Sequence, residues 1–552
     1  MAPMWTAEQQ KVIDLRDRNI LVSAAAGSGK TAVLVERIIQ RITDVSRPVD
    51  VDRLLIVTFT EAAASEMKER IGSAIEKQLE QRPGDARLEQ QAALIHTAPI
   101  TTIHSFCLSV IRDHFHVIGI DPGFRIVEEG ELKLFRQDVL DELLEECYEK
   151  GDERFLEFVE KFGRGRNDRR IEELILKLYE FSCSYPQPGK WLESCVRAYK
   201  EENMLSSGFV KNAELRVRRR GKEIGGILSR ALKVCEEPDG PYMYADMIES
   251  DRKYLDRIVK AESFEAMYDA VTGFAWKRLS AKRDATVSPE KKEEVKKLRK
   301  QAKKLVEGMQ DAYFYAPWQV WAEDMRDASG SMETLSGLVN QFSKLLDEKK
   351  RSRNIIDFND MEQFALAILT EEKNGRLAPS PVAEEYQERF EEVMIDEYQD
   401  SNLVQEAVLT SVSRMEKGQN NIFMVGDVKQ SIYRFRLSRP ELFMEKYDTY
   451  TLDDSICQRV DLHKNFRSRP EVLDSVNYLF EQIMQRGFGG IEYDDNAALY
   501  AGADFPAGPE EPDSGFSYRT ELLLMDKKEA AMRNADGSRD EKKAEARMIA
   551  RR

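Results

Sequence analysis

Four short apolar runs along the chain are each followed by polar residues. They span residues 20–22, 54–57, 393–395 and 422–425. A run of this kind is typical of a buried strand in a parallel sheet, with polar residues at its carboxyl end. The pattern therefore predicts that distant parts of the chain contribute strands to one α/β sheet.

The region between these strands has a different pattern. From about residue 125 to residue 350 the segments are charged and follow a helical period, as in Leu132, Phe135, Val139, Leu143 and Cys147. We therefore predict a large helical insertion. The predicted divisions are 1–125 and 351–460 for the two parts of a sheet domain, 126–350 for the insertion and 461–552 for the start of a further domain.

The first strand leads into AAAGSGKT at residues 24–31, and an apolar stripe of helical spacing begins at Val35. Strand, small-residue turn and helix predict a phosphate-binding loop, in which backbone N–H groups converge on phosphates at a helix N-terminus. Lys30 is expected to reach the β- and γ-phosphates of ATP, and Thr31 to bind Mg²⁺. The predicted nucleotide-binding residues, with Ala24 in place of the usual first glycine, are Ala24, Ala25, Ala26, Gly27, Ser28, Gly29, Lys30 and Thr31.

Two adjacent acids follow the third strand, in VMIDEYQD at residues 393–400. Asp396 is predicted to hold Mg²⁺, and Glu397 to orient and deprotonate the attacking water. Two acids after an apolar strand could also be surface decoration, but the upstream phosphate loop favours the catalytic interpretation.

The fourth strand leads into VGDVKQSIYRFR at residues 425–436. This mixture suits γ-phosphate sensing by the amide of Gln430, coupled to base stacking on Tyr433 and Phe435. Because the two rings alternate with Arg434 and Arg436, the pattern favours an exposed platform over burial.

Composition narrows the class of protein. The chain has 552 residues, of which 42% are hydrophobic and 33% charged, and its net charge is −16; these values are typical of a multi-domain protein. Since no signal sequence and no run of roughly 20 apolar residues is found, we predict a cytoplasmic protein without membrane contact.

One segment departs from the acidic average. Residues 277–304 contain twelve Lys and Arg against four acids, with apolar residues at helical spacing. We predict an amphipathic helix whose basic face contacts duplex phosphates; the alternative is an ordinary solvated face.

The order of the motifs resembles that of superfamily 1 helicases of the UvrD/PcrA/RecB type. Four further segments fit: WTAEQQ at 5–10, TFTEAAASEM at 58–67, TTIHSFC at 101–107 and LHKNFRS at 462–468. The resemblance implies that Gln9 recognises adenine and that Arg467 contacts the γ-phosphate. Glu61 and Ala62 depart from the family pattern.

The same resemblance implies a set of DNA contacts. For His104 and Phe106, a core or turn role is an equal alternative. The implied contacts are Thr58, Phe59, Thr60, His104, Phe106, Tyr433, Phe435 and Arg436.

A closer resemblance covers almost the whole chain. Residues 103–146 and 421–447 are similar to the AddA family, which belongs to the bacterial ATP-dependent helicase/nucleases. It implies a RecA-like P-loop sheet, the start of a second RecA-like domain, and a heterodimer with an AddB-like partner. Beyond Arg467 no later helicase motif and no nuclease motif is found. The chain therefore looks like an amino-terminal half, with nuclease activity expected only of the full-length protein.

The implied function is ATP-driven 3′-to-5′ movement on DNA and its unwinding, in processing double-strand breaks for recombinational repair. The substrates are single-stranded and duplex DNA, and the cofactors are ATP and Mg²⁺. Two alternatives stay open: a stand-alone repair helicase of the UvrD type, and an ATP-controlled DNA-binding clamp that does not unwind. The predicted catalytic residues are Lys30, Asp396, Glu397, Gln430 and Arg467.

Overall fold

The computed structural model describes residues 5–163, 167–200, 204–484, 492–506, 520–524, 532–533 and 539–550. The chain forms two compact units: a sheet unit of Met1–Ser109 with Leu369–Arg552, and a helical unit of Val110–Ile368. The two observed boundaries lie inside helices α5 (Ile103–His114) and α15 (Phe358–Leu369), where the composition does not change. They therefore differ from the predicted boundaries, which were placed after residues 125 and 350. Residues 461–552, predicted to begin a further domain, group with the sheet unit.

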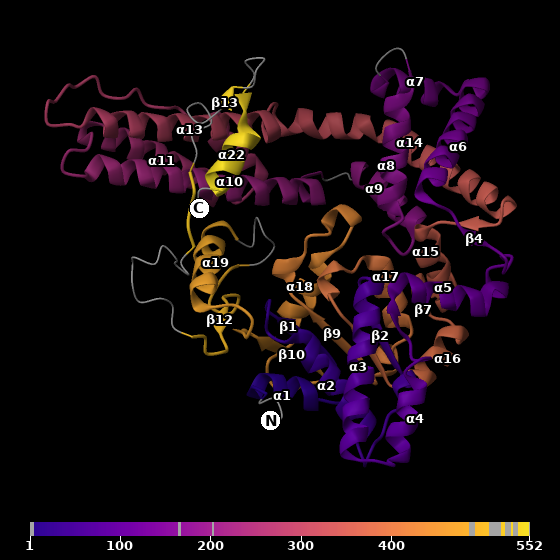
Figure 1. Cartoon of the computed structure of the whole chain (residues 1–552). Helices are drawn as coiled ribbons and strands as arrows, with labels where there is room; N and C mark the ends of the chain where they lie inside the picture. The colour runs from indigo at the N-terminus through magenta and orange to yellow at the C-terminus, as the bar shows by residue number, and fades with distance from the viewer. Residues whose placement is uncertain are drawn as a thin grey trace. The chain divides into compact units, whose positions relative to one another are not determined.

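The sheet unit is built on six parallel strands in the order β10-β1-β9-β8-β2-β3 (Figure 1). The four predicted runs are β1, β2, β8 and β9, so the prediction of one parallel sheet is confirmed. Since all the strands are parallel, their carboxyl ends meet at one edge. The strands are β1 (Asn19–Ala24), β2 (Leu54–Thr58), β3 (Ile100–Thr102), β8 (Glu392–Ile395), β9 (Ile422–Gly426) and β10 (Cys457–Leu462).

Helices packed on this sheet complete its core. The apolar stripe of α2 is buried, with Ile38 and Ile42 fully inaccessible, and it meets Ile56 and Phe423 of the strands. Burying side chains of this size contributes about 1.5–3 kcal/mol each. The other helices of the unit surround the same sheet or follow it in the chain. Their bounds are α1 (Ala7–Asp14), α2 (Lys30–Thr43), α3 (Glu61–Gln81), α4 (Ala86–Leu94), α16 (Pro381–Arg389), α17 (Leu403–Ser411), α18 (Pro440–Thr449), α19 (Pro470–Ile483) and α22 (Glu541–Ala550).

The helical unit contains two hydrophobic cores, and its longest helix contributes to both. Trp318 and Trp321, at the start of α14, pack against one core, and Leu338 and Phe342 are buried in the other. Figure 1 shows α14 running from one group of helices to the other. The helices are α6 (Glu129–Lys150), α7 (Glu153–Phe162), α8 (Arg169–Ser182), α9 (Pro188–Tyr199), α10 (Gly208–Glu236), α11 (Ala245–Lys260), α12 (Phe264–Thr272), α13 (Pro289–Tyr313) and α14 (Trp318–Ser352).

Short strand pairs complete the secondary structure. They are β4 (Arg125–Ile126) with β5 (Ile355–Ile356), β6 (Thr370–Lys373) with β7 (Arg376–Pro379), β11 (Lys464–Asn465) with β12 (Tyr500–Ala501), and β13 (Met532–Arg533) with β14 (Arg539–Asp540). Among the described residues, no helix combines the length and the apolar character needed to cross a bilayer.

The basic segment is helical over only part of its predicted length. Helix α13 begins at Pro289, where the hydroxyl of Ser288 accepts a hydrogen bond from the backbone N–H of Lys291, and residues 274–283 are not helical. The apolar stripe is buried as predicted, with Val295 inaccessible. One basic side chain is already bound: Arg299 Nε lies 2.7 Å from a carboxylate oxygen of Asp251. Arg299 is therefore not available for the DNA contact predicted for the basic residues of this segment.

Candidate active site and nucleic-acid interface

The phosphate loop connects the carboxyl end of β1 to the first turn of α2. Gly27 and Gly29 have φ angles of 70° and 83°, in the left-handed region that glycine adopts without strain. A Cβ atom on Gly27 would also lie 2.6 Å from the side chain of Asn465. Ala24 has no positive φ, because it is the last residue of β1, opposite Leu462 of β10. This explains why alanine is accepted where the sequence pattern usually has glycine.

The acids after β8 face the loop lysine. Lys30 Nζ lies 3.4 Å from both carboxylate oxygens of Glu397. Glu397 itself has a φ of 52°, a left-handed conformation that is uncommon outside glycine and marks a constrained position. The structure thus brings together Lys30 and Glu397, which are far apart in sequence and were predicted to share one site.

Asp396, beside Glu397, has an unusual proton affinity. Burial, followed by the neighbouring charge of Glu397, raises the pKa of its carboxyl from 3.8 to about 6, although the charge of Lys30 opposes the rise. Two crowded carboxylates are the electrostatic setting that a divalent cation relieves. Among the described residues, no group of three or more His, Cys, Asp or Glu side chains could hold a metal by itself. A magnesium ion here would therefore need the Thr31 hydroxyl, Asp396 and nucleotide phosphate oxygens as ligands.

A chain of hydrogen bonds continues from Glu397 to the next strand. Gln399 Nε2 donates to Glu397 Oε2 at 2.8 Å, and Gln399 Oε1 accepts from the backbone N–H of Asp427 at 2.9 Å. Gln430 Nε2 donates to Asp427 Oδ2 at 2.9 Å. Gly426 leaves room for this path, since a Cβ there would lie 2.4 Å from Gln399 Oε1. The predicted sensor Gln430 is thereby connected to the predicted base, although its contact with the γ-phosphate stays a prediction.

The loop after β10 is hydrogen-bonded to the phosphate loop. Asn465 Nδ2 donates to the carbonyl oxygen of Ala26 at 2.7 Å, and the backbone N–H of Phe466 donates to the carbonyl oxygen of Gly27 at 2.9 Å. Sequence reasoning missed Asn465; its signal was a single amide residue shortly before the predicted Arg467. The side chain of Arg467 is exposed, and its role toward phosphate stays a prediction.

A small cavity of about 230 Å³ adjoins the phosphate loop. Gln9, Phe466 and Tyr500 contribute to its wall. The amide of Gln9 is engaged: it donates to the carbonyl oxygen of Ser28 at 3.0 Å and accepts from the backbone N–H of Thr6 at 3.0 Å. Gln9 therefore couples this cavity to the loop, while adenine recognition by Gln9 stays a prediction.

Four of the predicted DNA contacts form an aromatic cluster, which we define as Phe59, Tyr433, Phe435 and Arg436. The ring centroids of Phe59 and Tyr433 are 4.5 Å apart, and those of Tyr433 and Phe435 are 5.9 Å apart. The guanidinium of Arg436 lies 5.5–6.0 Å from all three rings. Phe435 is 75% exposed, so its predicted exposure is confirmed.

Two of the remaining predicted contacts, Phe106 and Thr58, have structural roles. Phe106 is only 3% exposed and packs on Tyr386 and Phe390, with ring centroids 5.9 and 6.2 Å away. A ring buried in this way cannot stack on a base, so the expected DNA contact of Phe106 is wrong and its core role is confirmed. Thr58 is 2% exposed, and its hydroxyl donates to the carbonyl oxygen of Thr60. Its side chain is therefore also inaccessible to DNA.

Thr60 and His104 are both at least partly accessible to solvent. The exposed Thr60 accepts from the backbone N–H of Ala63 and so caps α3, and His104 is half-buried near the start of α5. Their contacts with DNA stay predictions.

Glu61, which departs from the family pattern, connects two of the motifs. Its Oε1 accepts hydrogen bonds from Thr102 Oγ1 at 2.9 Å and Ser105 Oγ at 2.6 Å. The bond from Ser105, followed by that from Thr102, lowers the pKa of Glu61, so the carboxylate is charged at neutral pH. Glu61 thus joins residues 58–67 to residues 101–107 by hydrogen bonds, and its departure from the family pattern disrupts neither motif.

Comparison with known proteins agrees with this geometry. Residues 5–451 match the family model of the UvrD/REP helicase N-terminal domain. A protein of Lachnoclostridium phytofermentans, named as the A subunit of an ATP-dependent helicase/nuclease, is 49% identical over 95% of this chain and 39% of its own length. Proteins of the same name from Geobacillus kaustophilus and Bacillus licheniformis are 42% and 44% identical over 99% and 95% of this chain, and over 44% and 42% of their own lengths.

The chain thus spans about two fifths of the length of these curated relatives. The family match itself covers most of the chain and includes the phosphate loop, the paired acids and the aromatic cluster. On this evidence the chain belongs to the UvrD/REP helicase family.

Proposed function

We propose that this chain is the ATP-hydrolysing motor part of a DNA helicase/nuclease. One observation carries the proposal: Lys30 of the phosphate loop faces Glu397 at 3.4 Å, in the same unit as an exposed aromatic cluster. The relatives support it, because they are named as ATP-dependent helicase/nuclease proteins.

The ion pair between Lys30 and Glu397 suggests how nucleotide starts the chemistry. Phosphate oxygens compete with Glu397 for Lys30, and the carboxylate released from Lys30 becomes free to accept a proton from water. Gln399 keeps hold of Glu397 through its 2.8 Å hydrogen bond, so the carboxylate stays oriented after the exchange. A Mg²⁺ ion held by Thr31 and Asp396 would neutralise phosphate charge during this step.

The hydrogen-bond chain also offers a route from hydrolysis to DNA. Burial, and then the charge of Glu397, raise the pKa of Asp400 to about 6, and the backbone of Tyr433 is among the groups that lower it. Asp400 therefore lies between the predicted base and the segment that carries the aromatic cluster. Through this path, a change in the charge or position of Glu397 would alter the binding of bases stacked on Phe435 and Tyr433.

The finer parts of the proposal follow from the family resemblance. They are 3′-to-5′ movement, action at double-strand breaks in recombinational repair, and a cytoplasmic heterodimer with an AddB-like partner. The names of the relatives support a partner, since each describes one subunit of a larger enzyme.

A strand-displacement assay tests the proposal. We expect ATP-dependent unwinding of a duplex with a 3′ single-stranded tail by the protein, and none by the Lys30→Ala variant. ATP hydrolysis that responds to single strands without any displacement would instead favour a DNA clamp. Hydrolysis indifferent to DNA would contradict both functions.

A further inference from the structure

A larger cavity, the arginine pocket, lies at the opposite edge of the sheet from the phosphate loop. Its volume is about 650 Å³, and its wall includes Glu392, where β8 begins, and residues that directly precede β9 and β10, Asn421 and Ile456. The phosphate loop follows the carboxyl end of β1 instead. The two sites are thus separated by the length of the strands.

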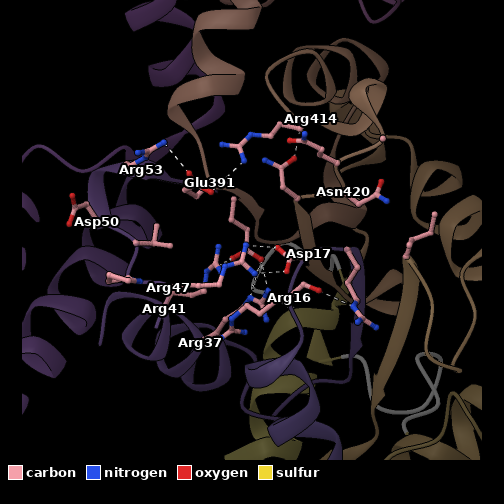
Figure 2. A pocket seen from close by; sticks show the side chains of 18 residues that line it. Arg16, Asp17, Arg37, Arg41, Arg47, Asp50, Arg53, Glu391, Arg414 and Asn420 are labelled. Carbon is pink, nitrogen blue, oxygen red and sulfur yellow. Dashed lines mark hydrogen bonds and ion pairs between the residues drawn. The ribbon is translucent and has the colours of Figure 1, made fainter. Parts of the chain in front are cut away.

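The wall of this pocket is strongly basic. Seven arginines and four carboxylates line it, an excess of three positive charges in a chain whose net charge is −16. Figure 2 shows that the labelled arginines approach the pocket from several sides, with Arg37 and Arg41 coming from α2. Like charges gather in this way only at an energetic cost, which an anionic ligand offsets.

One carboxylate is shared by the buried Arg37 and the half-buried Arg41. Arg37, 1% exposed, donates to Glu392 Oε1 from Nε at 3.2 Å and from Nη2 at 2.5 Å. Arg41 Nε lies 3.5 Å from Glu392 Oε2, and neither atom makes a hydrogen bond within the described residues. Arg16 lines the same pocket, and no carboxylate of the described residues lies within ion-pair distance of it.

The charges around Arg16 are therefore incompletely balanced. Burial, followed by the neighbouring charge of Arg37, lowers the pKa of Arg16 to about 10. A guanidinium that is partly desolvated beside others of its kind gains from an added anion.

The other three carboxylates of the wall are already occupied. Glu391 lies between Arg53 and Arg414, at 3.0 and 3.4 Å. Asp17 pairs with Arg47 at 2.8 Å, and Asp50 pairs with an arginine outside the pocket at 3.0 Å. None of them is left to neutralise Arg16.

We propose that the arginine pocket binds a phosphate anion: pyrophosphate, or the diphosphate or triphosphate group of a nucleotide. Guanidinium forks match phosphate oxygens, the excess of three positive charges matches such a group, and the volume lies in the range of small-ligand sites. The proposal does not depend on the helicase function. Helix α2 would then carry an anion site at each end, Lys30 at one and Arg41 at the other, about 16 Å apart along the helix axis.

Isothermal titration with inorganic pyrophosphate tests the site in the Lys30→Ala background, which removes the lysine of the phosphate loop and so weakens competing binding there. We expect saturable binding of one equivalent, and a loss of affinity of about tenfold or more when Arg16→Gln and Arg47→Gln are added. A parallel titration with ADP distinguishes the sources, since tighter binding of ADP identifies a nucleotide and weaker binding the free anion.

Two variants guard against a loss of folding. Arg16 also donates to backbone carbonyls of Ile13 and Leu15, so Arg47→Gln alone, which removes only an exposed ion pair, repeats the test with a smaller expected loss. Arg70→Gln also removes an exposed pair, on α3 and outside the pocket, and should leave binding unchanged. No saturable binding in the Lys30→Ala protein, or equal affinity with and without the pocket substitutions, would overturn the proposal.

Discussion

The two ends of helix α2 meet anions in different ways. At its amino end, Lys30 faces Glu397, which is 35% exposed and open to water. At its carboxyl end, Arg37 and Arg41 face Glu392, which is 5% exposed and shared between them. A base must exchange protons with water, and only Glu397 meets that requirement. The comparison indicates that the amino end is built for hydrolysis, whereas the proposed site at the carboxyl end is built for binding alone.

Glu397→Gln gives the largest expected effect, because it removes the base while keeping the shape and the hydrogen bond from Gln399. We expect the rate of ATP hydrolysis to fall by about 10²–10⁴-fold, with nucleotide affinity close to wild type. Steady-state hydrolysis and equilibrium binding of a fluorescent ATP analogue measure the two quantities. The exposed Glu385→Gln on α16 is the matched control. Hydrolysis at the normal rate would remove Glu397 from the mechanism.

Lys30→Ala tests whether the amino end of α2 acts on phosphate alone. We expect hydrolysis to fall by about 10²–10³-fold and single-strand affinity to stay nearly unchanged, since the aromatic cluster contains no part of the loop. Lys77→Ala, on the exposed side of α3, controls for the lost charge. A parallel loss of DNA binding would show that the two sites are not separable.

Phe435→Ala tests the same separation of ATP hydrolysis from DNA binding, now by changing a residue of the aromatic cluster. Single-strand binding should weaken by about 1–3 kcal/mol with little sequence preference, because every base can stack on a ring. Fluorescence anisotropy with oligonucleotides measures it, and the exposed Leu452→Ala serves as a control for lost apolar surface. Unchanged binding together with a lower melting temperature would assign Phe435 to packing.

The raised pKa of Asp396 predicts a pH dependence. With a pKa of about 6 in the folded protein against 3.8 otherwise, the folded chain binds the extra proton between these values, and stability falls as pH rises through that window. Asp396→Asn should therefore exceed wild type in unfolding free energy by about 1–3 kcal/mol at neutral pH, with the gap closing near about pH 4. Urea unfolding across pH measures the gap, with the exposed Asp474→Asn as control. A gap that does not vary with pH would contradict the assignment.

The smallest expected effect concerns α13. Lys297, Lys300 and Lys304 are exposed, and no ion pair within the described residues involves them. If they contact duplex phosphates, changing all three to Gln should flatten the salt dependence of duplex affinity by up to about 3 logarithmic units per decade of salt. Superimposable slopes would assign this face to solvent, while single-strand affinity provides the internal control.

Sequence was informative where the chemistry is contiguous. The phosphate loop and the acids after β8 occupy eight-residue stretches next to apolar runs, so their strands and their meeting could be predicted. The exposure of Phe435 followed from alternation with charges. The burial of Phe106 could not be predicted in this way, because its partners are far along the chain: Tyr386 lies on α16, and Phe390 follows the end of that helix.

Sequence was silent where a site is assembled from scattered positions. The arginines of the pocket come from separate segments between Arg16 and Arg414, with no spacing that marks them. Asn465 likewise supports the phosphate loop across more than four hundred residues. Helix α13 began later than its charge pattern indicated, because Pro289 after Ser288 fixes the start locally.

The central claim is that ATP chemistry at Lys30 and Glu397 is coupled to DNA held at the aromatic cluster. Its most direct test is the rate of ATP hydrolysis with and without single-stranded DNA, in the protein and in Phe435→Ala. We predict that DNA stimulates hydrolysis in the unaltered protein, and that Phe435→Ala keeps the DNA-free rate but needs more DNA for the same stimulation. A rate indifferent to DNA, or equal stimulation of both proteins at every DNA concentration, would contradict the claim.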